Sequence, residues 1–180
     1  MANWDSYIMY ARTDNLTEFW SSYYTSDKKK VLFIMGKGFD PRMNNNIELL
    51  IQTVKNIDME CLLVDFPYTV TPIYNDLIEQ NKDKLMTLST QYGFKVKREV
   101  RADFSEQWES GIKNICTMLT EIDFRNITDV IVDISSLPRS IYFNILRTLY
   151  SKFHSNEVNL FTIVSENVAM DNAIEEKSYK

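Results

Sequence analysis

Short apolar runs alternate with amphipathic segments along most of the chain, and this alternation constrains the fold more than any other feature. The runs have the length of buried strands, and the segments between them repeat apolar residues at helical spacing. The predicted strands cover 30–36, 60–66, 94–100, 128–135 and 157–165, and the predicted helices cover 41–58, 71–93, 105–123 and 138–155. This pattern predicts an α/β protein, a three-layer Rossmann-like domain with a five-stranded parallel sheet.

The strand order follows from which run is charged. Right-handed crossovers leave two common orders, 3-2-1-4-5 and 2-1-3-4-5. The third run, "FKVKREV", alternates apolar and charged residues and suits an edge strand that is half exposed to water. The first run, "VLFIM", is wholly apolar and suits the middle of the sheet. We therefore predict the order 3-2-1-4-5.

We predict that residues 1–30 are an N-terminal helical attachment to a Rossmann-like α/β domain over residues 31–180. The stretch "NLTEFWSSYY" predicts a short amphipathic helix whose aromatic face packs on the domain. Trp4, Tyr7 and Tyr10 precede it, and this aromatic content argues against a disordered tail.

Charge and cysteine content exclude several classes of protein. A net charge of -5 and a pI of about 5.0 argue against a general nucleic-acid-binding surface. No apolar run approaches the roughly 20 residues that span a bilayer, and the N-terminus lacks the pattern of a secretory signal. Cys61 and Cys116 are too few for a disulfide framework and are expected to be buried thiols. These features predict a cytoplasmic protein, and they leave a protein partner or a homodimer open.

Two loops stand where the predicted strand order reverses. In open α/β sheets the ligand binds outside the carboxyl ends of the strands at this point, here between the first and fourth strands. The two strands end in "GKGFDPR" and "DISSLPRS", and each loop places Pro-Arg at a helix start. Arg42 and Arg139 would each add a fork for phosphate or carboxylate to a helix N-terminus that already favours anions. The alternative is that both arginines pair with neighbouring acids or lie in solvent.

The glycines of the first loop also have two interpretations. Gly36 and Gly38 would let the backbone approach a phosphate closely, or they form an ordinary strand-to-helix turn. Pro41 excludes the full dinucleotide fingerprint, which needs a third glycine at that position. The loop is not a P-loop, because its lysine lies between the glycines.

Carboxylates and hydroxyls follow three of the predicted strands. Asp65 ends the second strand, where an acid accepts hydrogen bonds from ribose hydroxyls, or it is a turn residue. Asp133, with Ser135 and Ser136, could hold a sugar, a metal through water or a nucleophile, or these residues cap the next helix. Asp40 is a natural N-cap before Pro41, or it is a catalytic base or nucleophile. Three further polar residues rim the same edge: Ser165, Glu166 and Asn167.

The histidine content excludes several kinds of active site. His154, the only histidine, lies late in the fourth predicted helix, away from the carboxyl edge of the sheet. A Ser-His-Asp triad, a Cys-His pair and a histidine-based metal site are therefore not expected.

The stretch "LFIMGKGFD" resembles the first-strand loops of sirtuin-like domains and of some abortive-infection phage-defence proteins. In these loops a strand runs into G-x-G-F followed by Ser or Asp. The similarity covers about ten residues, and beyond it Pro41, Arg42 and three asparagines replace the G-x-P segment of the sirtuin-type loop. The resemblance implies a nucleotide such as NAD in the crevice, bound or cleaved. It carries over to Gly36, Gly38 and Asp40.

The residues together predict binding of a phosphorylated small molecule, with a nucleotide as the favoured ligand. The expected contacts are Gly36, Gly38 and Arg42 on one side and Ser135, Ser136 and Arg139 on the other, with Asp65 beside them. As an enzyme, the protein would be a nucleotide hydrolase or transferase that uses Asp40 or Asp133. As a sensor, it would signal to a partner, for example in bacterial defence. A third hypothesis is a structural role: the crevice binds no ligand, and the protein is a component of an assembly.

Overall fold

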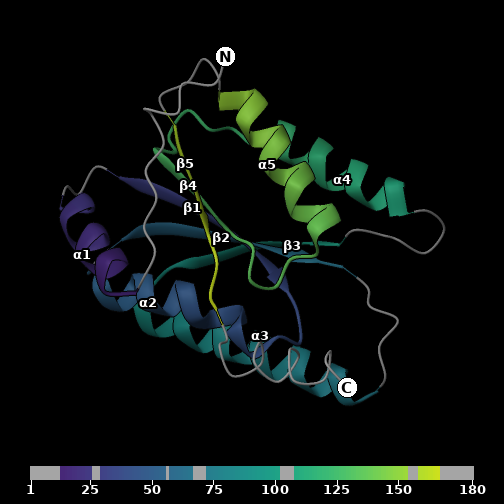
Figure 1. The fold of residues 1–180 in the computed structure, drawn as a ribbon, viewed down its shortest axis with the longest axis horizontal. Coiled ribbons are helices and arrows are strands. Elements are labelled where there is room, and N and C mark those ends of the chain that lie inside the picture. The colour runs from purple at the N-terminus through teal and green to yellow at the C-terminus, as the bar shows by residue number, and fades with distance from the viewer. Residues whose placement is uncertain are drawn as a thin grey trace, which may run out of the picture.

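The computed structural model describes residues 13–25, 29–55, 57–66, 72–101, 108–153 and 158–166. Within these ranges five strands form one parallel sheet with the order β3-β2-β1-β4-β5, as the sequence predicts (Figure 1). The elements are α1 (Thr13–Tyr23), β1 (Lys30–Lys37), the 3₁₀ turn η2 (Pro41–Asn44), α2 (Asn45–Thr53), β2 (Asp58–Asp65), α3 (Pro72–Tyr92), β3 (Lys95–Arg101), α4 (Trp108–Glu121), β4 (Asp129–Asp133), α5 (Arg139–Phe153) and β5 (Asn159–Ile163).

Helices cover both faces of the sheet, because the side chains of each buried strand alternate between two cores. Phe33 and Met35 of β1 point into the core that is shared with α1, α2 and α3. Leu32 and Ile34 of the same strand point into the core that is shared with α4 and α5. The result is three layers, with β1 in the middle of the sheet (Figure 1).

The helix after β1 ends earlier than the sequence predicts. We expected it to run over 41–58, but α2 ends at Thr53, and Val54 has an extended backbone with φ -108° and ψ 112°. The next strand explains the early end, because β2 begins at Asp58, paired with Lys30 at the very start of β1. The chain must therefore leave the helix by Val54 in order to reach the amino edge of the sheet. The other described elements overlap their predicted ranges.

The N-terminal helix packs on the domain through its aromatic face, as predicted. Trp20 is buried, and Phe19 and Tyr23 pack against the same core. The Tyr23 hydroxyl donates a hydrogen bond to Asp129, a fully buried carboxylate at the start of β4. Trp4, Tyr7 and Tyr10, which precede this helix in the sequence, lie outside the described residues.

Both cysteines are free thiols, with Cys61 buried and Cys116 half-buried. None of the helices in the described ranges is long and apolar enough to cross a membrane.

Candidate functional site

The carboxyl ends of β1 and β4 lie side by side, and the chain leaves them toward opposite faces of the sheet. After β1 it enters η2 and α2, which pack in the layer of α1 and α3. After β4 it enters α5, which packs beside α4 on the other face (Figure 1). This divergence is the switch point where open α/β sheets bind ligands. The structure thus brings the two predicted loops together at one edge.

The two loops are in direct contact at Gly36. The Ser136 hydroxyl donates a hydrogen bond of 2.9 Å to the Gly36 carbonyl oxygen. A Cβ atom on Gly36 would lie 2.8 Å from Leu137 Cδ2 and 2.9 Å from the Ser136 carbonyl oxygen. Gly36 is therefore required by the close approach of the β4 loop, whatever else approaches it. A Cβ atom on Gly38 would be 3.4 Å from its nearest neighbour, the Ser136 Cβ, so this contact is looser.

Asp40 caps the turn after β1, as the sequence predicts. Its carboxylate accepts a hydrogen bond of 2.9 Å from the Arg42 backbone N–H. The Arg42 side chain binds the same carboxylate, with Nε and Nη2 donating at 2.9 Å and 2.7 Å. Its Nη1 donates to the Ser165 carbonyl oxygen at 3.2 Å. We predicted that Arg42 either holds an anionic ligand or pairs with a neighbouring acid. In the structure it pairs with Asp40.

This pairing sets the protonation of Asp40. Burial raises the pKa of the carboxyl group, but the hydrogen bonds and charge of Arg42 outweigh burial and leave the pKa below its ordinary value. Asp40 is therefore ionised at neutral pH and forms an ion pair with the Arg42 guanidinium.

Arg139 has a different environment. It is the first residue of α5, it is exposed, and it makes no hydrogen bond or ion pair with any described residue. The first N–H groups of a helix lack intrahelical partners and favour an anion. Of the two arginines predicted to hold an anion, Arg139 is the one whose guanidinium is not already engaged by an acid in the described chain.

Asp133 ends β4 in a buried polar network. Its Oδ1 accepts hydrogen bonds from the backbone N–H and the hydroxyl of Ser135, and its Oδ2 accepts one of 3.1 Å from Asn46 Nδ2. Burial raises the pKa of Asp133 to about 6, against these hydrogen bonds, which lower it, and the charge of Asp40 raises it further. The carboxylate is fully buried, and both of its oxygens accept hydrogen bonds from other residues of the protein.

The network connects the ends of three strands. The Ser135 hydroxyl accepts hydrogen bonds from Asn46 Nδ2 at 3.2 Å and from the Ser165 backbone N–H at 2.8 Å. It thereby joins the helix after β1, the loop after β4 and the segment after β5. Asn46 was not among the predicted site residues. Its only signal in the sequence is its place among three asparagines in the first turn after "DPRM".

The loop after β1 is also held from the side of α3. Asn81 Nδ2 donates to the carbonyl oxygens of Gly38 and Asp40, at 2.9 Å each. Phe39 contacts Tyr74 of the same helix, with ring centroids 4.6 Å apart. Nothing in the sequence of α3 distinguishes Asn81 from the polar residues around it. It is a second site residue that sequence analysis missed.

Asp65 lies beside this loop, at the end of β2. Its carboxylate is 3.9 Å from Lys37 Nζ, and the same ammonium is 3.6 Å from Glu79 of α3. Asp65 is half-buried and in register with Lys37. It therefore lies one strand away from the switch point. We predicted that Asp65 accepts hydrogen bonds from ribose hydroxyls at this position.

Among the described residues, no group of three or more His, Cys, Asp and Glu side chains is placed to hold a metal ion. Ser165 and Glu166 do lie at the same edge, after β5. His154 and Asn167 lie outside the described residues.

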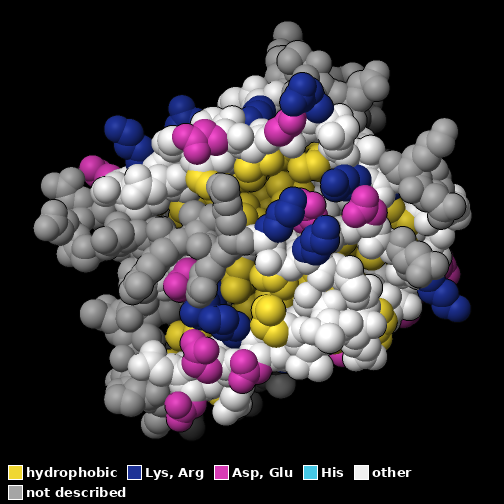
Figure 2. All heavy atoms as spheres, turned by 180° about the vertical axis from the view of Figure 1, so that it is seen from behind, with side chains coloured by type: hydrophobic (Ala, Val, Ile, Leu, Met, Phe, Trp, Pro, Cys, Tyr) yellow, Lys and Arg dark blue, Asp and Glu magenta, His cyan; other side chains and the backbone are white. Residues whose placement is uncertain are grey.

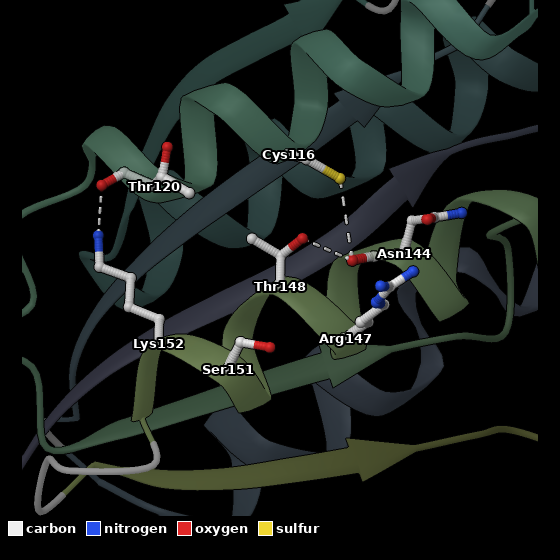
Figure 3. A pocket seen from close by; sticks show the side chains of 7 residues that line it. All are labelled: Cys116, Thr120, Asn144, Arg147, Thr148, Ser151 and Lys152. Atoms are coloured by element: carbon white, nitrogen blue, oxygen red, sulfur yellow. Dashed lines mark hydrogen bonds between the residues drawn. The ribbon is translucent and has the colours of Figure 1, made fainter.

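A hollow of about 640 Å³ lies on the outer surface between α4 and α5 (Figure 3). Several of its polar groups hydrogen-bond to backbone carbonyls of the two helices and of the chain just after α4. Thr148 Oγ1 donates to the Asn144 carbonyl oxygen at 2.8 Å, and Lys152 Nζ donates to backbone carbonyls at the end of α4. The hollow lies away from the switch point of the sheet, so the carboxyl edge is the better candidate site.

Comparison of the sequence with models of protein families and with curated proteins gives no match. The class of the protein therefore comes from its structure. It is a doubly wound α/β protein with the Rossmann-like strand order 3-2-1-4-5, and the loops after β1 and β4 are joined at its switch point.

Proposed function

We propose that this protein binds a phosphorylated small molecule at the carboxyl edge of the sheet, between the loops after β1 and β4. The observation that carries the proposal is the placement of Arg139. It begins α5 at the switch point, it is exposed, and no described residue pairs with it. A guanidinium beside the free N–H groups of a helix start is complementary to a phosphate group.

The two arginines then have different roles. The Arg42 guanidinium is engaged by Asp40 and by the Ser165 carbonyl, so an incoming anion would have to displace a carboxylate. We assign Arg42 the task of holding the loop after β1 against the end of β5. Arg139 is the residue that contacts the phosphate.

A nucleotide is the favoured ligand class for two reasons. Asp65 ends the strand next to β1, where nucleotide-binding α/β domains place an acid that accepts hydrogen bonds from ribose hydroxyls. The loop "LFIMGKGFD" also resembles the first-strand loops of sirtuin-like domains, which implies a nucleotide such as NAD.

Binding without turnover fits the carboxylates better than catalysis does. Asp133 is buried with both oxygens accepting hydrogen bonds, and Asp40 is paired with one guanidinium through both of its oxygens. Each would have to leave these partners before it acted on a substrate. We therefore favour a ligand sensor in the cytoplasm over a nucleotide hydrolase or transferase.

A thermal-shift screen with NAD, ATP, GTP, ribose 5-phosphate and pyrophosphate tests the proposal. A ligand at 100 times its Kd adds about 2.7 kcal/mol of stability, which raises the Tm of a chain of this size by about 5–11 °C. Arg139→Ala removes a charged hydrogen-bond donor and should weaken binding about tenfold to a hundredfold.

Arg147→Ala is the matched control, because Arg147 is an exposed arginine two turns further along the same helix. It should leave the shift unchanged. No shift with any of these compounds, or an equal loss in both variants, would contradict the proposal. Turnover of the bound nucleotide that disappears in Asp40→Asn would instead favour the enzyme.

A further inference from the structure

Strand β5 is an edge of the sheet, and its outer side has hydrogen-bonding groups to offer. The Asn159 N–H and the Ile163 carbonyl are bonded on the β4 side, to Thr128 and Ile134. Backbone groups of successive residues in a strand point to opposite sides, so those of Leu160 and Thr162 point away from β4. No described residue pairs with them. This edge is a template for one more strand.

The opposite edge of the sheet is protected against such pairing. The strand β3 has the sequence "KVKREVR", and Lys97 forms an ion pair of 2.7 Å with Glu60 of β2. Figure 2 shows the molecule from behind. Lys, Arg and acidic side chains gather in the middle of this view, between hydrophobic patches. In contrast, β5 has the sequence "NLFTI", without a charge or a proline. Charged side chains keep an edge strand from pairing with another chain, and β5 lacks them.

An apolar groove of about 670 Å³ runs along β5 and is lined by residues of α1 and α5. Figure 1 shows where these three elements lie in the fold. Leu16 and Phe19 of α1 form one wall. The other wall is a stripe of α5 at helical spacing: Phe143, Leu146, Arg147 and Tyr150. Phe143 is 61% exposed, and Val164, just after β5, is 57% exposed. Arg147 is the one charged residue among the described residues that line the groove.

We propose that β5 binds an extended segment of a partner protein, apolar on both faces and with a carboxylate that pairs with Arg147. An extended chain places alternate side chains on opposite faces. A strand added to β5 would therefore direct one set toward α1 and the other toward α5, while its backbone pairs with Leu160 and Thr162. This surface is separate from the carboxyl-edge ligand site and does not depend on it.

The charge of the groove favours a different partner over a second copy of this chain. Two copies that pair antiparallel through β5 are related by a two-fold axis normal to the sheet. That axis would set α5 against α5, and with the axis at the middle of β5 the two Arg147 side chains would face each other. Like charges that meet in an interface are unfavourable. An acidic residue on another chain meets Arg147 without this cost.

A displayed library of random octapeptides, selected against the full chain, tests the proposal. We expect enriched peptides with consecutive apolar residues and one Asp or Glu. Arg147→Glu should reverse that preference to Lys or Arg, with about a tenfold change in affinity for a given acidic peptide. Arg125→Glu, at an exposed arginine between α4 and β4, should leave the selection unchanged.

Two variants of the groove complete the experiment. Thr162→Pro removes an outward N–H without touching the bonds to β4, as an edge strand permits, and it should abolish peptide binding. Phe143→Ser truncates an exposed side chain, should leave the fold intact, and should weaken binding several-fold. Enriched peptides that bind Thr162→Pro and Phe143→Ser as well as the wild type would overturn the proposal.

The remaining outcomes also overturn it. A dimer by light scattering that Thr162→Pro dissociates would mean that a second copy covers β5. No enrichment, together with a large loss of thermal stability in Thr162→Pro, would mean that a segment of the chain itself lies there. No enrichment without that loss would mean that β5 accepts no strand.

Discussion

The substitution Gly36→Ala tests whether the first glycine of the loop serves the fold or the ligand. The new Cβ would lie 2.8 Å from Leu137 Cδ2, 2.9 Å from the Ser136 carbonyl oxygen and 3.1 Å from the Phe66 ring. The Leu137 methyl group can rotate away, but the Ser136 oxygen belongs to the backbone of the β4 loop. Overpacking of this kind costs roughly 1–3 kcal/mol. We expect about 2–3 kcal/mol here, because the backbone itself must move.

For a chain of this length that loss lowers the Tm by about 4–12 °C. The assay is urea denaturation of the wild type and the variant without ligand, with the thermal midpoint as a second readout. Gly38→Ala is the matched control. Its Cβ would have an ordinary contact of 3.4 Å with Ser136 Cβ, and its φ is not positive. Gly38→Ala should therefore stay within about 0.5 kcal/mol of the wild type or be slightly stabilising. Equal stability of the two variants would refute this assignment of Gly36.

Three further predictions concern the polar contacts. The folded pKa of Asp133, about 6, lies above its ordinary value, so this group favours folding most below pH 4, and the benefit disappears as the pH rises through 6. Relative to Asp133→Asn, the wild type should lose on the order of 3 kcal/mol between pH 4 and pH 7 in denaturation series, and parallel curves would contradict this. Tyr23→Phe removes a donor to the buried Asp129 and should cost about 1.5–3 kcal/mol in urea denaturation, whereas an unchanged midpoint would show that the bond contributes nothing. Asn81→Ala leaves two carbonyls of the β1 loop without their donor and should cost about 1–2 kcal/mol while it weakens ligand binding, and normal affinity would separate this loop from the site.

The fold could be predicted from the sequence because local patterns determine it. The apolar runs marked the strands, and the charges of "FKVKREV" placed the third strand at an edge, which distinguished the two possible orders. The end of α2 could not be predicted in this way. It depends on the register of β2 against β1, where Asp58 pairs with Lys30, and helical spacing continues past that point in the sequence.

The candidate site was predictable in position but not in its contacts. Topology alone brings the ends of β1 and β4 to one edge, so Asp40, Ser136 and Arg139 were placed correctly at that edge. The partners of each group depend on side-chain geometry across elements. Sequence analysis therefore missed Asn46 and Asn81, whose amides reach carbonyl and carboxylate oxygens on distant segments.

The most direct test of ligand binding at the switch point is a map of the bound nucleotide by amide chemical shifts. Labelled protein is titrated with NAD and, separately, with ATP. If the site is correct, the largest changes fall on residues 36–40 and 135–140, and Arg139→Ala greatly reduces them. Changes confined to the amino edge near Lys30 and Asn159, or to the outer surface of α4 and α5, would contradict a ligand site between β1 and β4.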